Sequence, residues 1–346
     1  MKNKKYPLVS IIIDNWNGKH FLSRCLDSIF VQKYPNFEVI LIDDASSDGS
    51  VEFIKKNYSK VKLIKNKKHV GFAIANNQGI RKSRGKYVLL LNNDTKVTKN
   101  FLFPLVGDLE KDKTIGAVQS KIKVLDNPEF LDDVATYLTP FGFLYHFGFF
   151  EKDTDKFNNQ FFTFSPKGAC FFIRKKVLKE VGLFDDRFYC YFEESDLAWR
   201  IWLAGYKIIY EPKSVIYHVV AGTMKKQTSA NRDYYAVRNR LNSILSNLSI
   251  PFLFFVLPLH LGTIFIFLLF YFLRLRMSNF FAILRALMWN FFQIRRTLKK
   301  RKWVQKEVRK ISDVELFKKI FVTPSFFYYL RMFFLYQKAY ERKTNL

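Results

Sequence analysis

Short apolar runs alternate with helix-forming stretches in the first part of the chain, and this alternation constrains the fold more than any other feature. The predicted strands lie at residues 8–14, 37–42, 61–64 and 87–91. Helical spacing of apolar residues separates them, most clearly over 19–32. Apolar runs rich in β-branched residues are typical of parallel strands buried on both faces. The alternation therefore predicts an α/β domain with a mostly parallel central sheet.

Polar side chains cluster where three of these predicted strands end. The clusters, in chain order, are Asp14 and Asn15, then Asp43 and Asp44, then Asn93 and Asp94. Ligands of parallel sheets bind beyond the carboxyl ends of the strands, so the three clusters together predict one binding site. Each cluster alone could also be a turn or a helix cap.

A second acidic cluster lies farther along the chain, at the start of a helix predicted over 194–204. Glu193, Glu194 and Asp196 are close together there, and aromatic residues precede them. Crowded carboxylates raise at least one pKa, which suits a general base that works near neutral pH. The alternative is that these acids only match the positive end of the helix dipole.

The strand-end clusters followed by the acidic cluster at 193–196 make the sequence resemble the family 2 glycosyltransferases, which are inverting enzymes with a GT-A fold. The similarity runs from Val9 to Asp94 and from Gly182 to His218, and it is greatest to the rhamnosyltransferase-like branch. It implies a GT-A-like α/β domain that binds a nucleotide sugar. It also implies transfer of the sugar to an acceptor hydroxyl with inversion at the anomeric carbon.

The resemblance assigns the donor site to the strand-end clusters. It implies that Asp44 accepts hydrogen bonds from the nucleotide base, with Asp14, Asn15 and Asp43 nearby. It weakly favours a dTDP- or UDP-sugar as the donor.

Asn92–Asp94 replaces the Asp-x-Asp motif of the family, so Asp94 is the single carboxylate expected on a divalent cation. His218 matches a histidine that completes this metal site in some relatives. Mg²⁺ or Mn²⁺ is the expected cofactor, because a hard cation prefers carboxylate and phosphate oxygens.

The resemblance also implies where the catalytic base lies. Inverting transfer needs a base opposite the leaving group to take the proton of the acceptor hydroxyl. In the family, this base comes from the acidic pair that starts the helix after the cleft. Glu194 is the predicted base, with Glu193 and Asp196 as its neighbours.

The C-terminal part of the chain differs in composition from the rest. Residues 250–273 carry no formal charge, and as a helix they would be roughly 36 Å long, enough to cross a bilayer core. Residues 274–346 hold 18 Lys and Arg against 4 Asp and Glu, so 14 of the formal charge of +27 lie there. The composition indicates a catalytic domain over 1–245 and a membrane-associating helical tail over 246–346.

Three arrangements of this tail remain open. A single crossing would put the basic segment and the catalytic domain on opposite faces, which the positive-inside tendency disfavours. The favoured interpretation is a pair of interfacial or re-entrant helices, at 250–273 and 279–294, with the basic run 295–302 on anionic headgroups. In the third arrangement, both helices pack on the catalytic domain without a membrane. The favoured interpretation predicts a catalytic domain on the cytoplasmic face and a glycan acceptor, lipid-linked or part of a glycolipid.

Other segments receive no catalytic assignment. Four histidines are interpreted as non-catalytic: His20, His69, His146 and His260. Trp16 could stack on a nucleotide base or simply pack. Residues 126–165 show weak periodicity, and we expect irregular structure along one wall of an acceptor cleft. Three scattered cysteines without a CxxC pair argue against a disulfide framework or a zinc site.

Two other classes of protein share some of these features. A nucleotidyltransferase would also need a nucleotide and a cation, but the acidic cluster would be unexplained. A non-enzymatic protein that binds membranes or nucleic acid would suit the net charge of +27. It would leave the strand-end clusters without a purpose, so nucleic acid is not the expected partner.

Overall fold

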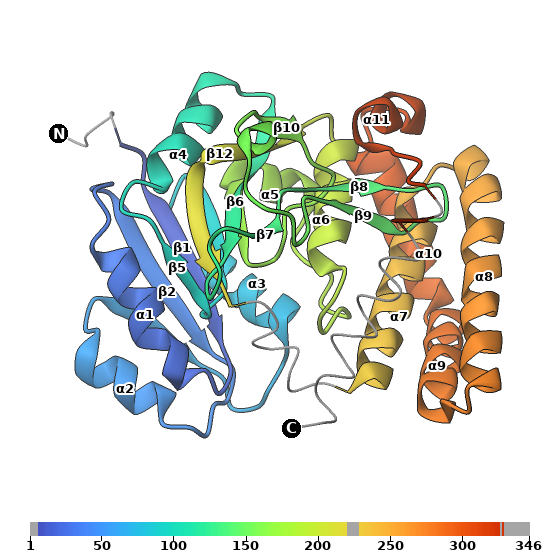
Figure 1. The fold of residues 1–346 in the computed structure, drawn as a ribbon, viewed down its shortest axis with the longest axis horizontal. Helices are drawn as coiled ribbons and strands as arrows, with labels where there is room; N and C mark the ends of the chain where they lie inside the picture. Colours follow the sequence, from blue (N-terminus) through green and yellow to red (C-terminus); the bar gives the residue numbers. More distant parts are fainter. Residues whose placement is uncertain (1–5, 220–227, 326, 329–346) are drawn as a thin grey trace.

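The computed structural model describes residues 6–219, 228–325, 327 and 328 of the 346-residue chain. Its centre is a ten-stranded sheet (Figure 1). Four strands lie parallel in the order β4-β1-β2-β3. These are β1 (Val9–Asn15), β2 (Phe37–Asp43), β3 (Val61–Lys65) and β4 (Tyr87–Leu91). The mostly parallel sheet predicted from the sequence is confirmed.

The other half of the sheet runs outward from β4 in the order β4-β11-β6-β12-β10. It consists of β6 (Ile115–Val124), β10 (Phe161–Phe162), β11 (Cys170–Arg174) and β12 (Lys207–His218). β11 is antiparallel to both neighbours, whereas β6 and β12 are parallel. β12 is a single long strand, and its register with β6 shifts between Glu211 and Val215.

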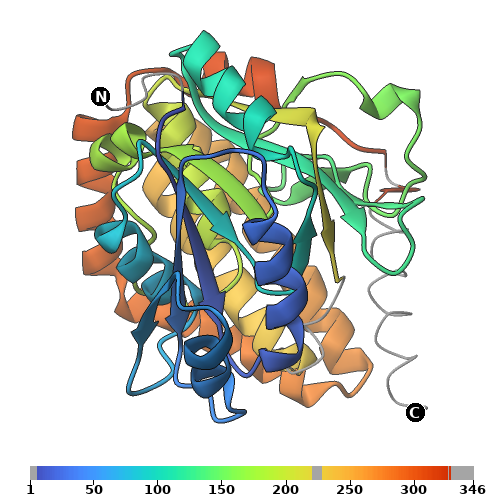
Figure 2. The ribbon, with the colours of Figure 1, turned by 90° about the vertical axis from the view of Figure 1, so that its left-hand side faces the viewer.

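Helices cover both faces of the sheet (Figures 1 and 2). They are α1 (Lys19–Phe30), α2 (Ser50–Asn57), α3 (Phe72–Lys82), α4 (Leu102–Lys111), α5 (Lys175–Val181) and α6 (Glu193–Leu203). Successive residues of β1 point into different cores: Ile12 packs in the core that contains α6, while Ile11 and Ile13 pack in the core that contains α1. This burial on both faces explains why β1 is a continuous apolar run.

The segment 126–165, expected to be irregular, contains several short strands. They are β7 (Leu131–Asp133), paired with β6, and the hairpin of β8 (Ala135–Leu138) and β9 (Leu144–Phe147). A 3₁₀ turn (Asp155–Phe157) precedes β10, and β5 (Thr95–Val97) pairs with β12. Strands this short, some of them carrying buried polar residues, give no period-two pattern, so the sequence did not reveal them.

The C-terminal region is helical, as predicted (Figure 1). It comprises α7 (Ser229–Asn247), α8 (Ile250–Leu273), α9 (Met277–Phe292), α10 (Ile294–Trp303), a π-helical turn (Val304–Val308) and α11 (Asp313–Ile320). Leu248, Val256, Val304 and Leu316 belong to the same hydrophobic core as β1 and α6. The boundary expected at residue 245 therefore falls within a continuous core.

Candidate active site

The ends of β1, β2 and β4 meet, and their polar side chains bond to one another. Asn15 donates to Asp43 Oδ1 (3.3 Å) and accepts from Asn93 Nδ2 (2.7 Å). Gly18 makes this approach possible, because a Cβ there would lie 2.2 Å from Asn93 Nδ2. The structure thus brings together the three clusters that the sequence placed at one rim.

Asp44 is fully buried, and donors within the protein occupy both of its oxygens. It accepts hydrogen bonds from Asn66 Nδ2 (2.8 Å) and from the backbone N–H groups of Val70 and Gly71. His69 Nδ1 lies 2.6 Å from Asp44 Oδ2, and the His69 ring stacks on Trp16 with centroids 4.2 Å apart. Asp44 therefore fixes the segment 66–71 and the Trp16–His69 stack.

Asp14 differs from Asp44 because one of its oxygens has no partner among the residues that the structure describes. Its Oδ1 is buried and accepts no hydrogen bond from any described residue. Burial, together with the nearby charges of Asp44 and Asp43, raises the pKa of Asp14 well above its usual range. In its protonated form, Asp14 can donate a hydrogen bond to a carbonyl group of a ligand; in either form, its Oδ1 can accept one from a ligand N–H group.

Asp94 and His218 lie together, as the sequence predicted for the metal site. His218 Nε2 is 3.2 Å from Asp94 Oδ1, and His218 Nδ1 is 2.7 Å from Asp132 Oδ2. Lys167 Nζ donates to the other oxygen of Asp132 at 2.6 Å. Burial opposes protonation of His218, yet the two carboxylates beside it raise its pKa to about 9.

A divalent cation fits these residues only in part. Among the described residues, no group of three His, Cys, Asp or Glu side chains is arranged to hold a metal ion. However, Asp94 Oδ1 is buried, and the close polar contact recorded for it is the ion pair with His218. His218 Nε2 faces that same oxygen, while Asp132 orients the ring from its other side. These are two ligands and an outer carboxylate, which suits a hard cation that keeps water and phosphate oxygens as its other ligands.

Glu193 and Glu194 start α6 directly after a strained turn. Tyr191 and Phe192 have φ of 65° and 69°, in the left-handed region that non-glycine residues rarely adopt. Asn239 of α7 donates to the carbonyl of Tyr191 (2.7 Å) and so holds this turn. Strain of this kind gathers at functional sites, where the surrounding structure enforces it.

Each of the two glutamates has a buried oxygen that lacks a hydrogen bond within the described part of the chain. Oε2 of each accepts no hydrogen bond from any described residue. Burial and repulsion by Glu194 raise the pKa of Glu193 well above its usual value. Burial also raises the pKa of Glu194, although His146 and Lys167 lie close enough to oppose that change. Lys167, one of the charges that act on Glu194, also donates to Asp132, which bonds to His218; Glu194 is thus linked electrostatically to the Asp94–His218 pair.

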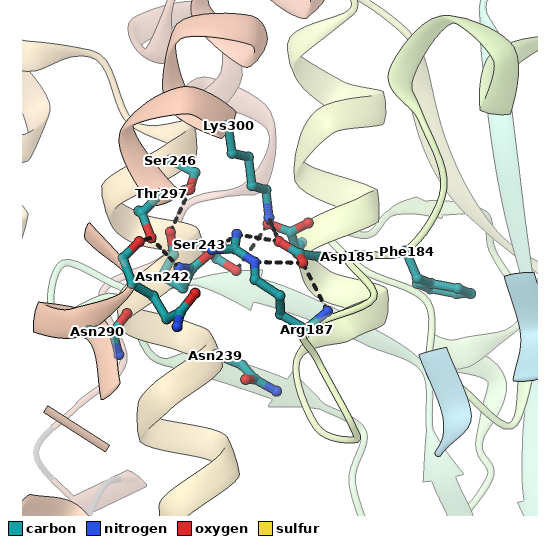
Figure 3. A network of polar contacts seen from close by, with 12 residues as sticks. Phe184, Asp185, Arg187, Asn239, Asn242, Ser243, Ser246, Asn290, Thr297 and Lys300 are labelled. Carbon is teal, nitrogen blue, oxygen red and sulfur yellow. Dashed lines mark hydrogen bonds and ion pairs between the residues drawn. The ribbon is translucent and has the colours of Figure 1, made fainter. Parts of the chain in front are cut away.

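The structure places Asp196 elsewhere, on the side of α6 that faces the C-terminal helices. It accepts hydrogen bonds from Lys300 Nζ (2.9 Å), Arg200 Nε (3.1 Å) and Ser243 Oγ (3.0 Å). Lys300 also reaches Asp185 at 3.0 Å (Figure 3). Burial alone would raise the pKa of Asp196, but Lys300 and Arg200 lower it. Asp196 thus joins α6 to α7 and α10 and does not lie beside Glu194's open oxygen.

Four residues of the candidate active site received no functional role in the sequence analysis. His69 and His146 were interpreted as non-catalytic, and Asp132 and Lys167 were not singled out. His146 Nδ1 lies 3.8 Å from Asp133 Oδ2, and His146 is one of the charges that act on Glu194. The pair Asp132-Asp133 within an aromatic segment was the one available signal, and the weak periodicity of that segment hid it.

The fold and this arrangement of carboxylates are typical of glycosyltransferases, and sequence comparison gives the family. The sequence model described as "Glycosyl transferase family 2" matches residues 10–182, which is half of the chain. The protein belongs to this family. The likeness to its rhamnosyltransferase-like branch stays a prediction.

Curated relatives include poly-β-1,6-N-acetyl-D-glucosamine synthases. The protein of that name from Staphylococcus epidermidis is 27% identical over 221 residues, covering 62% of this chain and 51% of the relative. The one from Staphylococcus aureus is 26% identical over 223 residues, with the same coverage. The chain thus spans about half the length of the curated relatives it matches.

Solved structures share the fold. GalNAc-T7, crystallised with UDP, GalNAc and Mn²⁺, matches with a TM-score of 0.58 at 21% identity, covering 70% of this chain and 48% of that one. The mannosyltransferase PcManGT from Pyrobaculum calidifontis, in complex with GDP-mannose and Mn²⁺, matches with a TM-score of 0.53 at 18% identity. That match covers 88% of this chain and 85% of the other. The GT-A-like fold expected from the sequence is confirmed.

Proposed function

We propose that the protein transfers a sugar from a nucleoside diphosphate to an acceptor hydroxyl, with inversion at the anomeric carbon. The observation that carries the proposal is that two buried carboxylates with different surroundings lie in one region: Asp94, which is paired with His218, and Glu194, whose Oε2 accepts no hydrogen bond from any described residue. Asp94 presents a buried oxygen beside His218, and Glu194 presents one at the start of α6. The first suits a cation on the leaving group, and the second suits a base on the acceptor. All the candidate residues lie within 1–245, the expected catalytic domain.

The donor binds at the ends of β1, β2 and β4. Asp14 and the stacked pair Trp16–His69 lie where the nucleotide base is expected, while Asn15 and Asn93 stand between them and Asp94. Asp43 and Asp44 hold this subsite in place through hydrogen bonds, Asp43 with Asn15 and Asp44 with the segment 66–71. A UDP- or dTDP-sugar is the proposed donor. The names of the curated relatives make a UDP-linked N-acetylhexosamine the first one to test.

Asp94 and His218 hold the cation, Mg²⁺ or Mn²⁺, with Asp132 orienting His218. When bound, the cation neutralises charge on the diphosphate leaving group. Both solved neighbours cited above contain Mn²⁺, which supports this choice. Because His218 would have to give up its proton to bind the cation, acid should weaken binding.

Glu194 acts on the acceptor. The acceptor oxygen attacks the anomeric carbon, the bond from that carbon to the diphosphate oxygen breaks, and the hydroxyl proton passes to Glu194. Its raised pKa makes this carboxylate a stronger base than an exposed glutamate. Burial and the charge of Glu194 raise the pKa of Glu193 well above its usual value, which disfavours a second negative charge in the site.

A lipid-linked glycan or glycolipid is the proposed acceptor, on a membrane whose cytoplasmic side holds the enzyme. The hairpin β8–β9 supports this choice. His146 on β9 lies near Glu194, while the carbonyl of Phe141, at the tip, accepts a hydrogen bond from His260 of the apolar helix α8 (2.8 Å). The two ends are five residues apart in the chain and so at most roughly 17 Å apart, which a sugar attached to a lipid could span to reach the base.

Release of nucleoside diphosphate tests the proposal. The full chain, with lipid and Mn²⁺ or Mg²⁺, is incubated with a panel of sugar nucleotides, with and without acceptor lipid extract. One donor should release its nucleoside diphosphate, and chelation should abolish release. Asp94→Asn should also abolish it, while the exposed control Asp126→Asn should not.

The alternative classes give different products. A nucleotidyltransferase would release pyrophosphate from a nucleoside triphosphate, and a binding protein would release nothing. Full activity after chelation would overturn the metal assignment. Equal loss in the Asp126→Asn control would show that the assay reports folding instead.

A further inference from the structure

Helix α8 presents a continuous apolar face that nothing in the described chain covers. Its outward side chains are at least two-fifths exposed and none is charged; the most exposed are Ile250, Phe254, Phe255, Phe265, Ile266 and Leu273. Within the described residues, α8 is also the one helix long and apolar enough to cross a membrane. Composition alone therefore leaves two orientations, across a bilayer or along its surface.

The opposite face of α8 is attached to the protein along its whole length. Near the start, the Phe252 ring packs on Phe317 of α11, with centroids 5.0 Å apart. In the middle, buried His260 bonds to the hairpin β8–β9. At the end, Tyr271 Oη donates to Asp233 Oδ2 of α7 (2.8 Å). Both ends of α8 are thus fixed to the body that carries the active site.

These attachments decide between the two orientations. A perpendicular crossing would draw α7 and α9 into the hydrocarbon beside α8, since α9 packs against both (Figure 1). α7 carries ionic side chains, among them Asp233 and Arg238, which hydrocarbon excludes. Moreover, α7 and α10 are bonded to α6, because Ser243 and Lys300 both donate to Asp196. We infer that α8 lies in the plane of a lipid surface, with its outer face among the acyl chains and its inner face on the protein.

Charge indicates which surface covers this face. Arg274 and Arg276 follow α8 directly, and Arg295, Arg296 and Lys299 are exposed on α10, which continues α9. Each basic residue near an anionic surface strengthens binding about fivefold. The same charges would repel one another if two copies of the chain met through this region. The occupant is therefore an anionic phospholipid bilayer. This inference concerns binding alone and stands whether or not the proposed reaction is correct.

The depth of α8 in the bilayer tests the orientation. Positions 254, 261, 265 and 272 lie on one line along the outer face and span roughly 27 Å of helix. Single cysteines there, in a Cys190→Ser full-length background, would carry an environment-sensitive fluorophore. The other two cysteines, Cys25 and Cys170, are buried. Lipids with quenchers at known depths then report the depth of each position in vesicles of phosphatidylcholine and phosphatidylglycerol.

All four positions should have the same shallow depth, about 5–10 Å below the headgroups. A probe at Lys60, exposed on the far part of the catalytic domain, should not be quenched. A depth profile that is greatest at 261 and 265 and small at 254 and 272 would show a crossing helix and overturn the inference. Absence of quenching at all four, with a dimer by light scattering, would show that a second copy covers the face.

Vesicle flotation gives an independent measure with unlabelled protein. Phe265→Glu should weaken binding to anionic vesicles at least tenfold, because it puts a charge at the centre of the immersed face. The matched control Phe162→Glu, on exposed β10, should bind like the original protein. Equal binding to vesicles of phosphatidylcholine alone would overturn the anionic part of the inference. Unchanged binding of Phe265→Glu would overturn the immersed face itself.

Discussion

Glu194 and Asp196 are two residues apart on α6, yet their surroundings are opposite. Glu194 has a buried oxygen with no hydrogen-bond partner among the described residues, and burial raises its pKa. Asp196 is completely buried, but two cations and two neutral donors surround it and its pKa is lowered. Adjacent acids on one helix thus serve different purposes, because a step of two residues turns the side chain to the other side of the helix.

The difference distinguishes an acid that acts on a ligand from an acid that holds helices together. An unpaired carboxylate is costly to bury, so its retention indicates work on a ligand. A fully paired carboxylate does no such work, and its removal affects the packing of helices instead. Lys300 illustrates the second case. It contacts Asp185 (Figure 3). It also contacts Asp196 and so links α10 to the helix that carries Glu194.

The largest expected effect is on catalysis, from Glu194→Gln. Loss of the base should lower kcat about 10³-fold, or about 4 kcal/mol of barrier, with little change in donor KM. The thermal midpoint should not fall, since no described residue donates a hydrogen bond to Glu194 Oε2. The measurement is steady-state nucleoside diphosphate release together with thermal unfolding. The exposed Glu52→Gln is the control, and near-normal turnover of Glu194→Gln would remove Glu194 from the mechanism.

The next effect is on stability, from Lys300→Met. This change leaves Asp185 and Asp196 buried with one cation fewer, and breaking such a pair costs about 3–5 kcal/mol. The free energy of unfolding, from denaturant titration, should fall by that amount. Lys299→Met, on the exposed side of the same turn, should change it by less than about 0.5 kcal/mol. If the two variants were equally stable, α10 would not be linked to α6 as described.

Much of this fold could be predicted from the sequence, because strands such as β1 and β4 are buried on both faces and read as apolar runs. The strand-end clusters were also predictable, since the topology brings them to one rim. The hydrogen bonds of Asp44 inside the protein were not predictable, because its donors at 66, 69, 70 and 71 lie in a loop without a sequence pattern. Nor was the separation of Asp196 from Glu194, since it depends on how α7 and α10 pack against α6.

The pH dependence of stability should distinguish the two acids. Asp196 has a lowered pKa in the folded protein, so its contribution is present above the unfolded pKa and is lost as pH falls through the folded pKa. Glu194 has a raised pKa, so its contribution is present in acid and is lost as pH rises through the folded pKa. Thermal midpoints across pH should therefore fall on both sides of a maximum. Glu194→Gln should flatten the fall on the alkaline side and leave the acid side unchanged, whereas flattening on the acid side would contradict the assignment.

The smallest expected effect separates the two glutamates from each other. Burial and the charge of Glu194 raise the pKa of Glu193 well above its usual value, which favours the uncharged form of Glu193. Glu193→Gln imitates that uncharged form with an amide of similar shape, and kcat should stay within about threefold of the original enzyme. The rate should still rise with pH through the pKa of Glu194. A loss of 10²-fold or more in Glu193→Gln, with Glu194→Gln only mildly impaired, would exchange their roles. It would place the base at the first residue of α6, where Phe192 holds the left-handed backbone.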